Sequence, residues 1–245
     1  MATRCRIRTE ISFMKWMMNK RKMKYFILFL LLSATLAVAG FQIYSELSSR
    51  QKEKRTFDSL VEMVTLPDNH FTDTDSISED STEQTESDRD LTELFRQNDE
   101  CVGWICIPDT TVNYPVMYTP DESQKYLRRN FYGEYSVCGV PFLDGRCALE
   151  SPKLIIYGHN MNNGTMFADL TKYINDDFKQ SHSAIEFETA NVQKKYIVSE
   201  VKITDISDKW YSNVDAETDG QVLILSTCYG WNENGRLLII AKEEK

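Results

Sequence analysis

A run of twenty uncharged residues near the N-terminus constrains the folding of this 245-residue chain more than any other feature. Residues 25–44 read YFILFLLLSATLAVAGFQIY. As a helix they would be about 30 Å long, which matches the hydrocarbon thickness of a bilayer. Tyr and Phe stand at both ends of the run, where aromatic side chains favour the membrane interfaces. The run therefore predicts a transmembrane helix.

The charges on either side of this run predict its orientation. Residues 1–24 carry eight Lys or Arg and one Glu, so this basic segment is expected in the cytoplasm, with the C-terminal bulk outside. The alternative is a cleaved signal peptide, since ATLAVAG offers small residues for cleavage. We favour a retained single-pass anchor, because the apolar run is longer than the usual core of a signal peptide.

A polar region follows the apolar run. Residues 45–64 are predicted to be a helical stalk, and residues 66–90 hold nine acidic residues and one basic residue. Such a segment cannot bury enough apolar surface to offset its chain entropy. We therefore interpret residues 45–90 as a stalk and a disordered acidic spacer that holds the next domain off the membrane. The net charge of −9 makes nucleic acid an unfavourable partner.

From Leu91 onward the sequence is dominated by short apolar β runs separated by turn residues. Three short segments, beginning near Leu91, Asp121 and Gly164, have helical patterns. This content predicts a single mainly β domain, a barrel or a sandwich. The eight β runs are GWICIP, TVNYPVMY, GVPFLD, KLIIYGH, AIEFET, KKYIVSEVKITDI, VLILSTC and RLLIIAKE.

Two of these runs deliver a reactive side chain at the strand end. Cys228 ends VLILSTC, and His159 ends KLIIYGH. A Cys–His site needs this arrangement. Arg236 opens the last β run, and it returns close to Cys228 if the two strands are antiparallel neighbours. A fixed cation there favours thiolate and can hold a developing oxyanion. The competing interpretations are a packed Cys228 and an ordinary edge-strand arginine.

The other cysteines and histidines are assigned no chemistry. Cys5 is expected in the cytoplasm, and His70 and His182 lie in polar segments. The spacings of the remaining thiols do not fit a zinc site, and no metal or cofactor is expected. We interpret these thiols as packed and unpaired, with a Cys138–Cys147 disulfide as the alternative. They are Cys101, Cys106, Cys138 and Cys147.

The two strand-end motifs resemble a known family. LSTC after an apolar strand, followed by an Arg that opens the last strand, is similar to the sortase signature. IIYGHNMNNGTMFADL resembles the histidine segment of class B sortases, and the resemblance extends over residues 91–245. It implies a mainly β fold, a closed barrel of about eight strands with two or three short helices, preceded by the N-terminal transmembrane helix.

The resemblance implies a role for each site residue. Cys228 would be the nucleophile, His159 the acid/base partner and Arg236 the transition-state stabiliser. The substrates would be secreted proteins with a C-terminal sorting signal of LPxTG or NPxTN type, transferred through a thioester to an amine of a lipid-linked cell-wall precursor. Substrate-binding roles are expected for Ser226, Thr227, Asn113, Tyr157 and Asn160.

The sequence departs from the class B pattern in one region. Class B sortases usually carry a long helical insert before the cysteine strand, whereas only SDKWYSNVDAETDGQ stands there in this chain. The sorting signal, and the choice between wall anchoring and pilin linking, therefore stay open. Two further alternatives are an extracellular cysteine hydrolase and a non-enzymatic surface protein.

Overall fold

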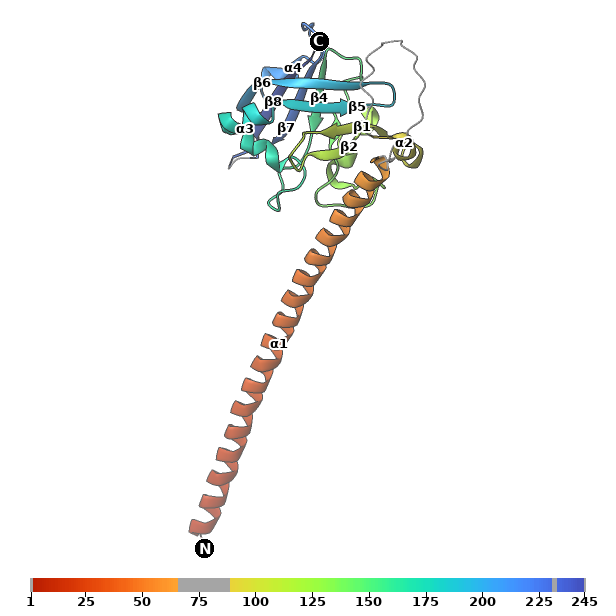
Figure 1. Cartoon of the computed structure of the whole chain (residues 1–245). Coiled ribbons are helices and arrows are strands. Elements are labelled where there is room, and N and C mark those ends of the chain that lie inside the picture. The colour runs from red at the N-terminus through yellow and green to blue at the C-terminus, as the bar shows by residue number, and fades with distance from the viewer. Residues whose placement is uncertain (1, 66–88, 231–232, 245) are drawn as a thin grey trace. The chain divides into compact units, whose positions relative to one another are not determined.

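The computed structural model describes residues 2–65, 89–230 and 233–244 and divides the chain into two compact units, Met1–Lys54 and Arg55–Lys245 (Figure 1). The acidic spacer predicted over residues 66–90 lies almost wholly outside the described residues. The first unit is the larger part of helix α1 (Ala2–Val64). In the described part of the chain, α1 holds the one helical segment long and apolar enough to cross a bilayer. Apolar side chains of this segment, among them Leu28 and Phe41, are exposed and form the surface that lipid would cover.

The second unit is a closed barrel of eight strands, and it confirms the predicted fold. All eight predicted β runs form strands. These are β1 (Cys101–Cys106), β2 (Asn113–Met117), β3 (Phe142–Leu143), β4 (Lys153–Tyr157), β5 (Ala184–Glu188), β6 (Gln193–Asp205), β7 (Val222–Cys228) and β8 (Gly235–Glu243).

The strands pair around the barrel in the order β1-β2-β3-β4-β7-β8-β6-β5, and β5 pairs with β1 to close it. Most neighbours are antiparallel, but β4 and β7 run parallel from Lys153↔Val222 to Tyr157↔Ser226. A parallel pair needs a long crossover connection, and here β5 and β6 are part of it. The C-terminal ends of β4 and β7 consequently meet at the same end of the barrel.

Short helices occupy the connections between strands. In Figure 1, α2 lies beside β1 at the edge of the barrel, and α3 follows the 3-10 helix η3. The segments predicted as helical near Asp121 and Gly164 form 3-10 helices, which are common as short connectors between other elements. The helices are α2 (Thr92–Gln97), η1 (Pro120–Glu122), η2 (Lys125–Arg128), η3 (Ala168–Ile174), α3 (Asp176–Ser181) and α4 (Lys209–Ser212).

The barrel interior is filled by the long apolar strands that the sequence pattern indicates. β4 and β7 are buried almost along their whole lengths, as expected for a parallel pair with neighbours on both sides. Side chains from the two strands and from β8 form one continuous core. Its fully buried members on these strands are Leu154, Ile155, Ile156, Leu223, Ile224, Leu225, Leu237, Leu238 and Ile239.

The last turns of α1 belong to the barrel unit, so the compact unit begins N-terminal to Leu91, where the sequence pattern places the domain boundary. Leu60 and Val64 are buried in a cluster with Trp104, Met117 and other barrel residues. The polar composition of the stalk hides these few apolar positions at helical spacing.

The chain on the two sides of residues 66–88 is held together. Thr65 forms a β-bridge with Arg89, and the Asp90 amide donates to the Val64 carbonyl at 2.9 Å. Arg89 also contacts Glu186 on β5 at 3.3 Å. The described residues on the two sides of this gap, Thr65 and Arg89, therefore both belong to the barrel unit.

We expect Leu60→Ala to lower the free energy of unfolding of the barrel by about 2–5 kcal/mol, because it removes a fully buried side chain. Urea unfolding of the full-length chain in detergent, followed by tryptophan fluorescence, measures this change. The matched control is Glu62→Ala, an exposed position on the same helix. Equal stability of the two variants would mean that the end of α1 is only a stalk.

Candidate active site

The parallel pairing of β4 with β7 sets the geometry of the candidate site. Tyr157 is level with Ser226 in the register, and the Gly158 amide donates to the Ser226 carbonyl at 3.1 Å. The hydroxyl of Thr227 donates to the Gly158 carbonyl at 2.8 Å, which extends the contact beyond the last ladder pair. The next residue on one strand is His159 and on the other is Cys228. The pairing thus brings the two predicted reactive groups to one rim.

Cys228 differs from the other described cysteines in its exposure. Every other residue of β7 is buried, and Cys228 is exposed. All five described cysteines are free thiols, so the packed-thiol interpretation is confirmed for the four others and no Cys138–Cys147 disulfide is present. Burial raises the pKa of Cys101 to about 12 and that of Cys147 to about 11, which keeps both protonated and unreactive. An exposed Cys228 does not fit a packed structural role.

A close backbone contact holds His159 at the strand end. A Cβ on Gly158 would lie 2.5 Å from the Phe167 ring, so only glycine lets that ring pack on the chain here. The chain then turns back, with a β-bridge between Asn160 and Met166 and a hydrogen bond from the Phe167 amide to the His159 carbonyl at 2.9 Å. The YGHNM and GTMF parts of the motif are therefore two sides of one tight turn.

The imidazole of His159 has a defined partner. Its Nε2 lies 2.9 Å from the Leu127 carbonyl. A carbonyl oxygen only accepts hydrogen bonds, so Nε2 carries the proton and Nδ1 keeps a lone pair in the neutral ring. Burial lowers the pKa of His159; the Leu127 carbonyl opposes this shift, and the Arg128 cation adds to it. A neutral imidazole with a free Nδ1 can accept a proton.

Arg236 lies opposite Cys228 in the antiparallel β7–β8 pair, as predicted from the two β runs. Its Nη1 donates to the carbonyls of Glu233 and Gly235, each at 2.8 Å. Among the described residues, Nη2 and Nε of Arg236 have no partner. One arm of the guanidinium is thus fixed to the backbone, and the other N–H groups can serve a ligand.

These side chains line one cleft of about 740 Å³. Of the eight predicted site residues, six lie in its wall: Tyr157, His159, Ser226, Thr227, Cys228 and Arg236. Asn160 lies beside it, and its amide donates to the Cys228 carbonyl at 3.1 Å. Asn113 is not brought to the cleft. It begins β2, and its side-chain oxygen accepts from the Trp104 indole at 2.6 Å, which is a structural bond between β1 and β2.

Sequence reasoning missed several polar residues of the cleft wall, and three of them contact one another: Asp144, Arg146 and Tyr211. Asp144 and Arg146 stand directly after β3, where an Asp-x-Arg pattern behind a buried apolar strand is the one local signal of an ion pair with a buried carboxylate. Tyr211 lies in the short segment before β7, and nothing local to its sequence marks it. Its position is set by the tertiary fold alone.

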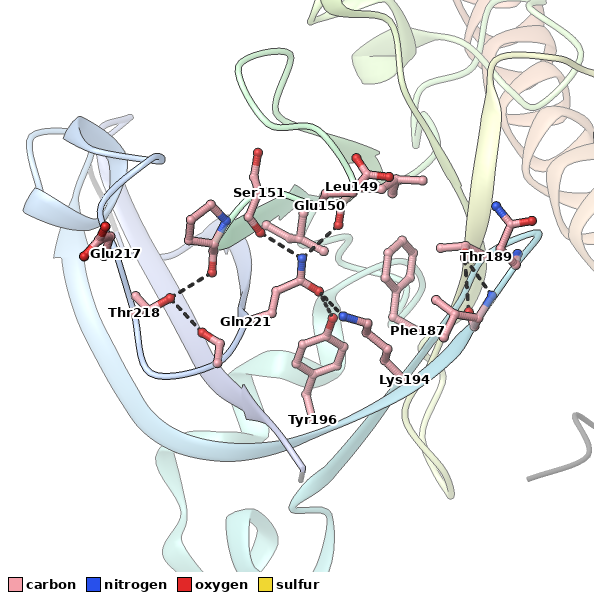
Figure 2. Close-up of a pocket in the computed structure, with 15 residues that line it drawn as sticks. Leu149, Glu150, Ser151, Phe187, Thr189, Lys194, Tyr196, Glu217, Thr218 and Gln221 are labelled. Atoms are coloured by element: carbon pink, nitrogen blue, oxygen red, sulfur yellow. Dashed lines mark hydrogen bonds between the residues drawn. The ribbon is translucent and has the colours of Figure 1, made fainter. Parts of the chain in front are cut away.

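A second cavity of about 610 Å³ lies at the starts of β4 and β7, the opposite end of the barrel (Figure 2). Gln221 occupies its centre in Figure 2, donating to the Leu149 and Ser151 carbonyls at 2.8 Å and accepting from Tyr196 at 2.6 Å and Lys194 at 3.1 Å. The described residues that line it include neither Cys nor His. Because Gln221 is satisfied within the protein, we interpret this cavity as structural.

Comparison with known proteins gives one consistent result. A family model described as the sortase domain matches residues 105–244. Sortase B of Listeria monocytogenes is 32% identical over 181 residues, which cover 62% of this chain and 73% of that protein.

Solved structures agree. A Staphylococcus aureus sortase B–substrate complex matches with a TM-score of 0.55 and 26% identity, covering 63% of this chain and 84% of that one. Sortase B from B. anthracis in complex with AAEK1 matches with a TM-score of 0.53 and 30% identity over the same shares of the two chains. The family model covers more than half of the chain, and the similar proteins and structures are all class B sortases. This chain therefore belongs to the sortase family, class B, the cysteine transpeptidases.

Proposed function

We propose that Cys228, His159 and Arg236 form the catalytic centre of a membrane-anchored sortase that joins secreted proteins to a cell-wall amine. The observation that carries the proposal is the exposed thiol at the end of a buried strand. The imidazole and the guanidinium come from the two strands that flank it. The proposed donors carry a C-terminal sorting signal of LPxTG or NPxTN type.

In the first half-reaction, the Cys228 sulfur attacks the backbone carbonyl carbon of the signal threonine, and the thiol proton passes to Nδ1 of His159. The carbonyl oxygen becomes an oxyanion, and the Nη2–H and Nε–H groups of Arg236 stabilise it. One such donor typically lowers a barrier by about 3–4 kcal/mol. When the C–N bond breaks, the imidazolium gives its proton to the departing amine, and a thioester remains on Cys228.

In the second half-reaction, an acceptor amine attacks the thioester carbonyl. His159, neutral again, takes a proton from the amine as the new C–N bond forms. The C–S bond of the tetrahedral intermediate then breaks to leave the amide, and the imidazolium returns its proton to the Cys228 sulfur. A neutral resting imidazole suits both steps, and this fits the lowered pKa of His159. The chemistry uses only groups of this chain and its two substrates.

The proposed location places the enzyme beside both substrates. With the basic segment in the cytoplasm and α1 across the membrane, the barrel lies outside the cell as part of a single-pass protein. The donor proteins and a lipid-linked acceptor are held at the same membrane. Tethering all three raises their effective concentrations.

The direct test of this function uses the full-length chain in detergent with LPxTG and NPxTN peptides. Mass spectrometry should detect a thioester on Cys228, and added triglycine or a diaminopimelate-type amine should convert it to a new amide. Cys228→Ala and His159→Ala should each abolish the thioester, while Cys106→Ala and His182→Ala should retain it. A thioester that forms but yields only hydrolysed product with every amine would favour the cysteine hydrolase alternative.

Arg236→Lys should reduce the rate of acylation by about 10²–10³-fold, the range for loss of one oxyanion donor. A lysine keeps the charge but cannot bind two backbone carbonyls and also present a second planar donor group. Single-turnover acylation rates measure the effect, with thermal unfolding as the check on folding. Wild-type rates in Arg236→Lys would exclude the guanidinium as the oxyanion donor.

The imidazole of His159 should titrate below the usual value of 6.5, because burial disfavours its charged form. Arg128→Met should raise this pKa, since it removes a cation that opposes protonation. NMR titration of the imidazole signals, assigned with His159→Gln, measures both values. Arg129→Met is the matched control, and an equal shift in the two variants would argue against a specific effect of Arg128.

A further inference from the structure

A closed ring of contacts joins the wall of the cleft to the strand that carries the cysteine. It consists of Asp144, Arg146, Tyr157, Tyr211 and Ser226, and we call it the floor network. Its members come from four places in the sequence: the residues just after β3, the end of β4, helix α4 and the end of β7. All five line the cleft.

Asp144 is the buried centre of the floor network. One carboxylate oxygen accepts from Arg146 Nε at 2.9 Å and from the Arg146 amide at 3.0 Å. The other accepts from Arg146 Nη2 at 2.7 Å and from the Tyr157 hydroxyl at 2.7 Å. Burial alone would raise the pKa of Asp144, but these bonds hold it below its usual value. The carboxylate is therefore ionised and fully satisfied, and it holds Arg146 in one orientation.

The remaining arm of Arg146 reaches another segment. Its Nη1 donates to the Tyr211 carbonyl at 2.7 Å, across 65 positions of sequence. Tyr211 lies on α4, in the connection between β6 and β7. A charge-assisted hydrogen bond to a backbone carbonyl places the main chain of that segment, whatever side chains it carries.

The side chain of Tyr211 completes the ring. Its hydroxyl lies 2.7 Å from Oγ of Ser226, and its ring stacks on that of Tyr157 with centroids 6.3 Å apart and planes 12° apart. Ser226 precedes Cys228 by two residues and is 1% exposed. The connection between β6 and β7, which forms one wall of the cleft, is therefore held at two points of Tyr211. Arg146 binds its backbone carbonyl, and Ser226, on the strand that carries Cys228, binds its side-chain hydroxyl.

We propose that Arg146 is a positioning residue for the peptide substrate: with Asp144 as its anchor, it holds the α4 segment as a preformed wall of the cleft. This inference rests on the proposed function. The α4 segment is a single helical turn, so contacts from outside it fix its main chain. Lys153 Nζ donates to the Asn213 carbonyl at 2.9 Å, just after the helix, and Arg146 holds the Tyr211 carbonyl at the cleft. Arg146 touches none of Cys228, His159 and Arg236. Its loss should weaken peptide binding and leave the reacting groups unchanged.

The kinetic test compares Arg146→Met with Arg129→Met in the full-length chain. Arg129 also donates to a backbone carbonyl, that of Gly133 at 2.9 Å, but it does not line the cleft. For the sorting peptide that the wild type cleaves, Arg146→Met should raise KM by about tenfold, the effect of losing one hydrogen bond to a charged group. The kcat and the rate of Cys228 alkylation by iodoacetamide should stay within about twofold of wild type. Arg129→Met should match wild type in all three.

Two further variants test whether misfolding explains the effect of Arg146→Met, because this substitution leaves the buried Asp144 carboxylate without its cation. Arg146→Lys keeps a cation beside Asp144 but cannot also reach the Tyr211 carbonyl, so it should share the KM defect. The double variant D144N/R146M removes both charges and should behave like Arg146→Met. A wild-type KM in Arg146→Lys would overturn the proposal.

Hydrogen exchange measures how firmly the α4 segment is held when no substrate is present. Amides of residues 206–221 should exchange faster in Arg146→Met than in wild type and Arg129→Met, with the strands of the barrel unchanged. Unchanged exchange in this segment, or faster exchange with an unaltered KM, would overturn the proposal. If the wild type cleaves no sorting peptide, the proposed function fails, while the exchange experiment still tests the contact between Arg146 and α4.

Discussion

The hydrogen-bonded register between the parallel strands β4 and β7 is the constraint on which the rest of the site depends. Side chains alternate between the two faces of a strand, so a shift of one residue would reverse the face of every residue on β7. Such a slip would turn Cys228 toward the interior and bring buried Thr227 to the rim. The slip is opposed by the continuous apolar core of both strands and by the two bonds of Gly158 to β7.

Cys228 is exposed, whereas the four other thiols of the barrel unit are buried, and this difference decides which thiol can react. Burial raises the pKa values of Cys101 and Cys147, so these thiols act as small apolar side chains. Cys228 is exposed beside a guanidinium, and its histidine is kept neutral by partial burial. The same desolvation that makes most of the cysteines unreactive also prepares the imidazole to accept a proton. Reactivity is thus assigned by position in the barrel, since all five residues are chemically identical.

The strands were predictable from sequence because each is a short apolar run bounded by turn residues, and strand-end chemistry pointed to Cys228 and His159. Arg236 followed from one assumption, that the last two strands are antiparallel neighbours. The packed end of α1 was missed, although Phe57, Leu60, Val61 and Val64 stand at helical spacing, because the rest of the stalk is polar and the partners of these residues are distant in sequence. For Asn113 the prediction named a residue that the fold does not bring to the cleft. The family resemblance suggested a substrate contact, but the Asn113 side chain binds the Trp104 indole within the barrel. The floor network could not be predicted, because it forms only when four sequence-distant segments are placed together.

The β-bridge between Thr65 and Arg89 has a consequence for engineering of the chain. The bridge fixes these two residues next to each other on the barrel unit. When two points of a chain are already held together, doubling the number of residues between them costs only about 0.6 kcal/mol in closure entropy. An epitope tag or a small reporter inserted between Thr65 and Arg89 should therefore leave the barrel folded.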